Sequence, residues 1–269
     1  MQYLDRRGLP EPGDGFEWRV APAGPVLVCR PLEDVARHVF TTRPWPLGSR
    51  PGPADAESWN DLARVMDVES DRLLRMHQVH GAGVIVQRSG APVAGNADAD
   101  IVLGDDPAVA LAVQTADCVP LLIADSRTGA VAAAHAGWRG LAQAVPRVTV
   151  EAMAGELGSR PADLVAAIGP SIGAEHYEVG TDVRMRFEGA GFSPAQLARW
   201  FFIAERPDHW YFDGWQAARD QLESAGIPTG RIAVAALCTA SDRELFCSFR
   251  RDGSATGRMA AAIRPRRNS

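Results

Sequence analysis

Three side chains that lie far apart in the sequence have the chemical types that bind a metal ion. Cys118 precedes an apolar run with the length of a buried strand, His135 ends another such run, and His80 lies just before a third. One thiolate and two imidazoles suit zinc, and three protein ligands leave a coordination position for water or substrate. Core packing is the simpler explanation for each residue alone, because free cysteine is among the most buried residue types. The metal hypothesis therefore depends on the three residues meeting.

The elements around Cys118 and His135 predict how two of these side chains meet. Residues 119–124 and 130–135 are apolar runs separated by a segment rich in turn formers. We expect a hairpin in which Pro120 lies opposite His135, with Cys118 projecting from the same face. Diagonal neighbours on one face of a sheet lie within about 7 to 8 Å, so both side chains can reach one ion.

Four further polar residues near these positions have predicted supporting roles. His77 precedes His80 by three residues, and the β-branched run that follows favours a strand with the two rings on opposite faces, so we interpret His77 as structural. Asp98 and Asp100 are candidates for orienting a ligating imidazole, as carboxylates often do. Asp117, in the turn beside the cysteine, is a candidate substrate-binding residue.

The rest of the chain predicts an α+β fold: a single layered domain, residues 25–269, with a mixed β-sheet flanked by helices. Residues 1–24 are rich in glycine, proline and charge, and predict an irregular N-terminal lead-in. The spacing of apolar residues from Trp59 to Met66 predicts an amphipathic helix with Ser58 as its N-cap. Residues 141–153 predict a second helix, whose start Pro146 delays or kinks. Nine aromatic residues between 187 and 215 are most simply explained as core.

Composition excludes several classes of function. The formal net charge is −5 and the sequence pI is about 5.7, so neither nucleic acid nor an anionic membrane would be attracted. All 28 basic residues are arginines. The absence of lysine excludes lysine Schiff-base catalysis and a P-loop lysine, and leaves arginine as the permanently charged cation for holding phosphate.

Cysteine use and hydropathy indicate where the protein works. The four cysteines have no regular spacing, and neither a secretory signal nor a run of about 18 apolar residues is present. We expect a cytoplasmic protein with reduced thiols and without a membrane partner. The sequence leaves the oligomeric state open.

Several blocks, in chain order, resemble one protein family. The match extends over roughly residues 39–263. Its motifs are His77-Gln78-Val79-His80-Gly81, Ala97-Asp98-Ala99-Asp100, Thr115-Ala116-Asp117-Cys118-Val119-Pro120, Ala134-His135-Ala136-Gly137-Trp138-Arg139-Gly140, Ile168-Gly169-Pro170, Tyr177-Glu178-Val179-Gly180, Ser248-Phe249-Arg250-Arg251-Asp252-Gly253 and Thr256-Gly257-Arg258-Met259. The chain is similar to the laccase-domain, or polyphenol oxidase-like, proteins, also known as purine nucleoside phosphorylases and peptidoglycan editing factors.

This resemblance implies an enzyme with a zinc site whose ligands, His80, Cys118 and His135, also serve catalysis. It implies phosphorolysis of adenosine, inosine, guanosine and methylthioadenosine, and deamination of adenosine, with purine nucleosides and phosphate as partners. Zinc lowers the pKa of a bound water from about 15.7 towards 7, which suits attack at the purine C6. Candidate substrate contacts are Arg43, Arg139 and Arg250. The family usually has a Gly-Gly-Val-Ser segment after the position of Arg43, where this chain has a stiffer loop with two prolines.

Three alternatives remain open at the level of sequence. A metal-independent hydrolase or amidase, acting for example on peptidoglycan precursors, would use His135 to activate the Cys118 thiolate. A copper-dependent phenol oxidase is weaker, because multicopper chemistry needs more histidines than the six in this chain. A structural zinc site would need a fourth protein ligand, such as Cys247 or His77.

Overall fold

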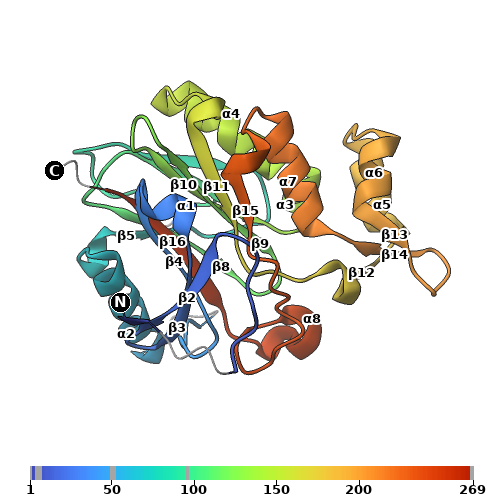
Figure 1. Cartoon of the computed structure of the whole chain (residues 1–269), viewed down its shortest axis with the longest axis horizontal. Helices are drawn as coiled ribbons and strands as arrows, with labels where there is room; N and C mark the ends of the chain where they lie inside the picture. The colour runs from blue at the N-terminus through green and yellow to red at the C-terminus, as the bar shows by residue number, and fades with distance from the viewer. Residues whose placement is uncertain (1, 4–7, 49–52, 95–96, 267–269) are drawn as a thin grey trace.

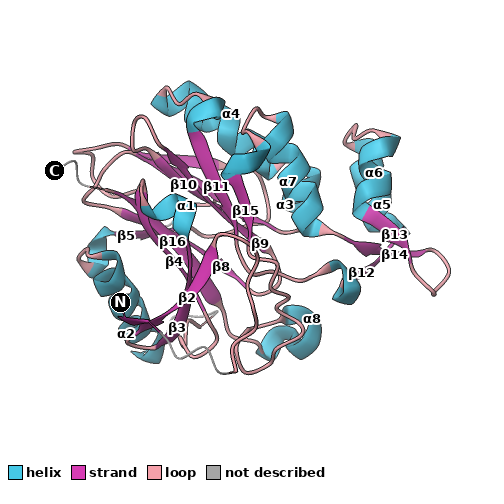
Figure 2. Ribbon diagram, in the orientation of Figure 1, coloured by secondary structure: helices cyan, strands magenta, loops and turns pink. Residues whose placement is uncertain are grey.

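The computed structural model describes residues 2–3, 8–48, 53–94 and 97–266. The described strands form three sheets, and the two larger sheets stack on each other with helices on the outer face of each (Figure 1). Figure 2 shows the layers: α2 lies beneath one sheet, and α4 and α7 lie above the other. The predicted α+β class is confirmed, although the strands divide among three sheets where one mixed sheet was expected.

The first large sheet has seven strands and is antiparallel except where β5 pairs with β8. In spatial order its strands are β1 (Gln2–Tyr3), β2 (Phe16–Ala21), β3 (Gly24–Cys29), β4 (Ala36–Thr41), β16 (Met259–Pro265), β8 (Ala110–Thr115) and β5 (Leu73–Arg75).

The second sheet has six strands and is mixed, because both of its edge strands pair in parallel. Its spatial order is β15 (Ile232–Val234), β11 (Leu164–Ile168), β9 (Val119–Asp125), β10 (Val131–Ala136), β7 (Ile101–Gly104) and β6 (Val84–Gln87). The third sheet is small and antiparallel, in the order β12 (Glu178–Gly180), β14 (His209–Phe212), β13 (Phe201–Ile203).

Helices cover the outer faces and the small sheet. The α-helices are α1 (Arg30–Glu33), α2 (Pro53–Met66), α3 (Trp138–Ala142), α4 (Val145–Leu157), α5 (Thr181–Gly189), α6 (Pro194–Trp200), α7 (Gly214–Ser224) and α8 (Phe249–Asp252). Short 3₁₀ turns are η1 (Ser70–Arg72), η2 (Pro161–Asp163), η3 (Ala174–His176), η4 (Thr229–Arg231) and η5 (Gly253–Ala255). No helix within the described ranges is long and apolar enough to cross a membrane.

The main core lies between the two large sheets, because alternate residues of their strands point inward. Phe40, Leu111 and Ile263 of the first sheet pack in one buried cluster with Leu122 and Ala133 of the second. Phe187, Trp200, Phe201 and Phe212 are buried in a second cluster, as the sequence indicated. Phe202 of β13 is 47% exposed, so the core prediction is wrong for that residue.

Two local predictions were wrong. The lead-in is not irregular throughout: Phe16–Ala21 forms β2, because Phe16 and Trp18 alternate into the core and the strand pairs with β3. Ser58 is not an N-cap, because α2 already begins at Pro53 and Ser58 is buried inside it. Proline fits the first turn of a helix, where its missing N–H costs nothing.

The central prediction about the hairpin is confirmed. β9 and β10 pair antiparallel with His135 opposite Pro120. Pro146 delays a helix as expected: α3 ends, Ala144 takes a left-handed conformation with φ of 57°, and α4 starts at Val145. The strand before Cys118 belongs to the other large sheet, however, so the turn at 116–118 passes from one sheet to the other.

Candidate metal centre

His80, Cys118 and His135 meet at one end of the second sheet. Their ligand atoms all lie within 4.8 Å of one another. The two imidazole rings are 4.9 Å apart between centroids and nearly perpendicular, at 83°. His135 is buried, Cys118 is half-buried and His80 is exposed, so the cluster opens towards solvent on the side of His80. The structure thus brings together the three residues that the sequence singled out.

Asp100 positions both histidines. One of its oxygens accepts a hydrogen bond from Nδ1 of His135 at 2.8 Å, which leaves Nε2 of that ring as the ligand atom. The same carboxylate accepts the backbone N–H groups of Val79, His80 and Gly81 at 3.2, 3.1 and 2.7 Å. These three bonds hold the loop in which His80 has a φ of 58°, a left-handed conformation that is uncommon for histidine.

Asp117 holds the turn that carries Cys118. It has a φ of 86°, its carbonyl accepts from Ile172 N–H at 3.0 Å, and its Oδ1 accepts from the Thr239 hydroxyl at 2.6 Å. Its Oδ2 accepts the backbone N–H of Arg250, also at 2.6 Å. Both carboxylate oxygens of Asp117 therefore accept hydrogen bonds. Through them and its carbonyl, Asp117 joins the turn that carries Cys118 to the segments at Ile172, Thr239 and Arg250.

Gly137, directly after β10, leaves the space that the sulfur occupies. A Cβ added at Gly137 would lie 2.8 Å from Cys118 Sγ and 3.2 Å from Cδ2 of His80. Real Cβ atoms essentially never approach a heavy atom as closely as 2.8 Å, so the contact with the sulfur is the more severe of the two. A larger residue here would thus displace two of the three candidate ligands at once.

The electrostatics of the cluster favour a thiolate beside an imidazolium. Burial alone raises the pKa of the Cys118 thiol, but the charge and hydrogen bond of His135, with help from His80, outweigh burial and lower it to about 6. Burial alone lowers the pKa of His135, but the Cys118 charge and the Asp100 carboxylate raise it to about 9. A thiolate is the form of cysteine that binds metals and attacks substrates.

Two of the predicted phosphate contacts, Arg139 and Arg250, each lie over an aromatic ring. The guanidinium of Arg250 lies 5.0 Å from the centre of the Tyr177 ring, and Arg139 lies 4.3 Å from the centre of the Trp138 ring. Burial and the negative Cys118 raise the pKa of Tyr177 above its usual range, and the charges of Arg250 and Arg139 oppose that rise. Tyr177 therefore lies within electrostatic range of Cys118, Arg250 and Arg139.

Other predicted residues lie in different surroundings. Arg43 donates to the carbonyl of Arg243 at 2.9 Å and contacts Asp252 at 3.4 Å, so its guanidinium is engaged by the C-terminal segment. His77 pairs through Nδ1 with Asp98 at 2.7 Å, and both side chains are exposed. His77 therefore lies outside the candidate ligand cluster, and of the two predicted carboxylates Asp100 is the one that contacts a candidate ligand.

The donor set fits an open zinc site better than a closed one. Among the described residues, the cluster contains three ligand residues. The candidates for a fourth ligand were His77 and Cys247. His77 is paired with Asp98, and Cys247 is buried, which raises the pKa of its thiol. A thiolate, two imidazoles and a carboxylate behind one ring match the ligand and supporting groups that zinc enzymes use.

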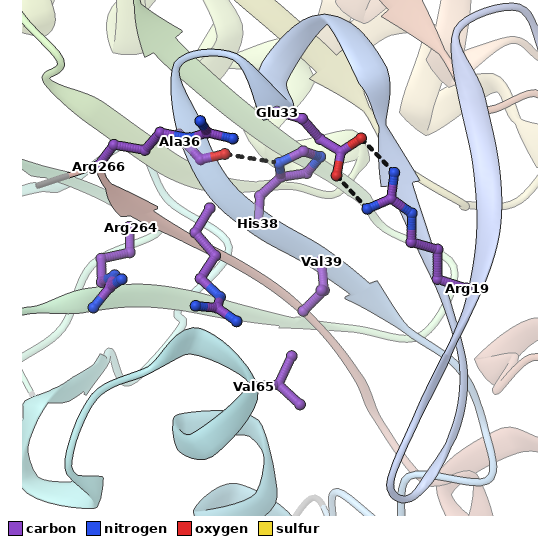
Figure 3. Close-up of a pocket in the computed structure, with 9 residues that line it drawn as sticks. Arg19, Glu33, Ala36, His38, Val39, Val65, Arg264 and Arg266 are labelled. Carbon is purple, nitrogen blue, oxygen red and sulfur yellow. Dashed lines mark hydrogen bonds and ion pairs between the residues drawn. The ribbon is translucent and has the colours of Figure 1, made fainter. Parts of the chain in front are cut away.

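A separate cavity of about 360 Å³ is rich in arginine, but it does not include the cluster. Figure 3 shows its lining; the residues are Arg19, Glu33, Ala36, Arg37, His38, Val39, Val65, Arg264 and Arg266. Arg19 bonds to Glu17 and Glu33, and Arg264 bonds to Asp67 at 3.0 Å. Several of these cations are thus already neutralised by carboxylates of the same chain.

Sequence reasoning missed the roles of Tyr177 and Gly137. Both stand inside motifs that were recognised, but neither has a ligand chemistry that would single it out. For Gly137, the available signal was its position two residues after His135, which is a predicted site residue. Its packing against Cys118 Sγ exists only after the hairpin has formed.

Two relatives of this chain are named as purine nucleoside phosphorylases. It is 41% identical over 208 residues to a "Purine nucleoside phosphorylase" of Deinococcus radiodurans, covering 77% of this chain and 76% of that protein. It is 38% identical over 188 residues to "Purine nucleoside phosphorylase YfiH" of Escherichia coli, covering 70% of this chain and 72% of that one.

Solved structures share the fold over nearly the whole chain. YfiH of Bacillus licheniformis superposes with a TM-score of 0.82 at 26% identity, covering 93% of this chain and 99% of that chain. YlmD of Geobacillus stearothermophilus gives a TM-score of 0.80 at 29% identity, covering 94% and 100%. The model of the multi-copper polyphenol oxidoreductase laccase family matches residues 54–266. With that match and these relatives, the chain belongs to this laccase-like family.

Proposed function

We propose that this protein is a zinc-dependent purine nucleoside phosphorylase. The observation that carries the proposal is the meeting of His80, Cys118 and His135 at an open, thiolate-containing site. The names of the relatives in Deinococcus radiodurans and Escherichia coli support the reaction type. We infer adenosine, inosine, guanosine and methylthioadenosine as substrates.

The metal would be held by Nε2 of His135, Sγ of Cys118 and a ring nitrogen of His80. When bound, zinc supplies a Lewis acid that stabilises developing negative charge without a proton transfer. Asp100 keeps the ring of His135 in the tautomer and orientation that metal binding requires. Zn²⁺ with one thiolate and two neutral imidazoles would keep a net positive charge, which would attract an anion.

Phosphate would approach from the side of Arg139 and Arg250. In phosphorolysis a phosphate oxygen bonds to the ribose C1′, the bond from C1′ to the purine nitrogen breaks, and the purine leaves with a proton. The exposed guanidiniums of Arg139 and Arg250 can pair with phosphate oxygens and so hold the nucleophile near the sugar. Arg43 and Asp117 stay weaker predictions as substrate contacts, because each side chain makes two polar contacts within the protein, whereas the guanidinium of Arg250 donates one, to the Glu178 carbonyl at 2.8 Å.

The test is an assay of zinc-loaded protein with each nucleoside, with and without inorganic phosphate. We expect release of free base and ribose 1-phosphate that requires phosphate and falls when a chelator removes the metal. Arg139→Gln and Arg250→Gln should raise the KM for phosphate more than that for nucleoside. Fully zinc-loaded protein that released no base from any of the four nucleosides would overturn the proposal.

Adenosine deamination is a second proposed activity, and it is separable from the first. The names of the relatives described above do not mention it, so it rests on the suitability of a zinc site for attack at the purine C6. Formation of inosine from adenosine in the absence of phosphate is the readout. If only adenine forms, and only with phosphate, the deaminase proposal is wrong while the phosphorylase proposal stands.

One observation favours an alternative mechanism. The depressed pKa of Cys118 and the raised pKa of His135 are also what a thiol hydrolase or amidase needs, for example one acting on peptidoglycan precursors. Metal removal discriminates between the two: a hydrolase would keep its activity without metal and lose it on alkylation of Cys118. The phosphorylase should lose activity in both treatments.

Copper is the alternative that the family's descriptive name suggests. Of the six histidines, His80 and His135 are in the cluster, while His38 is committed to backbone groups and His77 to Asp98. That leaves too few imidazoles near the cluster for a set of several coppers. Metal analysis of purified protein, with a phenol oxidation assay of copper-loaded protein, tests this alternative directly.

A further inference from the structure

A second group of metal-binding side chains lies outside the cluster described above. Glu175 and His176 end the short turn η3, and Cys238 follows β15. One ligand atom from each residue lies within 4.8 Å of the other two. Glu175 and His176 are exposed and Cys238 is half-buried, so an ion can reach all three from solvent.

The separations match those of ligands on one tetrahedral ion. Cys238 Sγ lies 3.5 Å from His176 Nδ1, and that nitrogen lies 3.1 Å from Glu175 Oε1. Zinc bonds of about 2.3 Å to sulfur and about 2.0 Å to nitrogen or oxygen, at a tetrahedral angle, place S and N about 3.5 Å apart and N and O about 3.3 Å apart. The two separations that involve His176 Nδ1 therefore already suit one bound ion, and the carboxylate oxygen lies within 4.8 Å of the sulfur.

Backbone contacts hold these ligands in place without the metal. The N–H of Gly173 donates to Cys238 Sγ at 3.2 Å, which helps to fix the position of the sulfur. On either side of Cys238, Ser171 bonds to Leu237 at 3.2 Å and to Thr239 at 3.0 Å. These bonds fix the cysteine against the loop that precedes η3.

Gly173 also makes room for the carboxylate. A Cβ at this position would lie 2.5 Å from each oxygen of Glu175, so the carboxylate folds back over the glycine. This places Oε1 beside His176 although the two ligands are neighbours in sequence. The donor set combines a thiolate, an imidazole and one carboxylate, which favours zinc or a similar transition metal over calcium or magnesium.

We propose that Glu175, His176 and Cys238 form a second metal site that binds Zn²⁺ or a similar divalent transition-metal ion. The site is distinct from the cluster of His80, Cys118 and His135. It adjoins the same structural support, because Asp117 bonds to Ile172 at 3.0 Å and to Thr239 at 2.6 Å. The second site does not depend on the proposed enzymatic activity.

Metal stoichiometry tests the second site. Purified protein is stripped, dialysed against micromolar free Zn²⁺, and its zinc content measured per chain. We expect two zinc ions for the wild type, one each for Cys118→Ser and Cys238→Ser, and none for the double variant. His77→Ala is the matched control, since it removes an exposed imidazole paired with Asp98 and should keep two ions.

Cobalt supplies a readout that is specific for the ligand. Co²⁺ bound to a thiolate gives a charge-transfer band in the near ultraviolet. Cys118→Ser should retain this band through Cys238, and the double variant should lose it. His176→Ala, which changes an exposed residue, should lower the stoichiometry to one while far-UV circular dichroism stays unchanged. The proposal is wrong if folded Cys118→Ser protein binds neither zinc nor cobalt, or if Cys238→Ser still binds two ions.

Discussion

Two buried histidines of this protein have pKa values that are shifted in opposite directions. His135, at the metal cluster, and His38, beside the arginine-rich cavity of Figure 3, are each 3% exposed. The pKa of His135 is raised to about 9, whereas that of His38 is lowered to about 4. Burial is equal and cannot explain the difference.

Their neighbours explain it. His135 faces the carboxylate of Asp100 and the thiolate of Cys118, which both stabilise a positive ring. At His38, burial is joined by the positive charges of Arg19 and Arg266, and the ring accepts the N–H of Cys29 at 2.8 Å, which requires an unprotonated nitrogen. The comparison teaches that polar partners, not burial, prepare a histidine for chemistry.

The largest effect should come from removing the thiolate at the charged histidine. Cys118→Ser deletes both a candidate metal ligand and the counter-charge of His135. We expect kcat/KM for phosphorolysis to fall about a thousandfold or more, which is about 4 kcal/mol of transition-state stabilisation. Cys29→Ala is the control: it removes a thiol next to His38 and should leave the rate within about twofold of wild type. Equal losses in the two variants would contradict the proposed site.

The next effect concerns stability in acid. Because the pKa of His38 is about 4 in the folded protein and 6.5 ordinarily, the unfolded chain binds a proton first as pH falls. The stability contribution of neutral His38 is complete above pH 6.5 and is lost as pH falls towards 4, by about 3 kcal/mol in total.

His38→Gln tests this, since glutamine can still accept from Cys29 N–H but does not titrate. Urea unfolding between pH 7.5 and 4.5 should show a shallower loss of unfolding free energy in the variant than in wild type. Parallel curves would show that His38 does not contribute to acid sensitivity.

A smaller effect is expected from the carboxylate that distinguishes His135. Asp100→Asn keeps an acceptor near Nδ1 but removes the charge, so zinc affinity should fall about 10- to 100-fold, equivalent to about 1.4 to 2.7 kcal/mol. Competition with a chelator measures the affinity. Asp98→Asn is the matched control, because its partner His77 lies on the surface. If both substitutions weaken zinc equally, Asp100 has no special role.

The smallest effect should be the change in the free energy of unfolding with pH that Cys118 and His135 together produce. The raised pKa of His135 gives stability below pH 6.5 that is lost as pH rises to about 9. The lowered pKa of Cys118 gives stability above about pH 9 that is lost as pH falls to about 6. The two slopes oppose each other over the same interval, so their sum should stay within about 1 kcal/mol.

Thiolate absorbance of metal-free protein, measured as wild type minus Cys118→Ser, should therefore titrate with a midpoint near 6. Over the same pH interval, the two proteins should change in stability almost in parallel. A midpoint near 9, the ordinary value, would mean that His135 does not stabilise the thiolate.

Much of the candidate site can be predicted from the sequence. The hairpin that places His135 opposite Pro120 follows from two apolar runs and a turn, because antiparallel pairing allows few registers. The sequence did not predict that Thr115 and Val119 belong to different sheets. Nor did it predict β2, because the flanking glycines and prolines masked the alternation of Phe16 and Trp18.

Local chemistry by itself determined that His80, Cys118 and His135 were candidate ligands, that arginine is the permanently charged side chain available to hold phosphate, and that apolar runs form buried strands. Tertiary structure decided which carboxylate supports which histidine, since Asp98 and Asp100 differ by two positions and bond to rings in unlike surroundings. It also decided that Cys238 lies beside His176, 62 residues earlier in the chain. Residue type and pairing register are properties of short segments, whereas the charges that surround a buried ring come from segments that meet only when the chain folds.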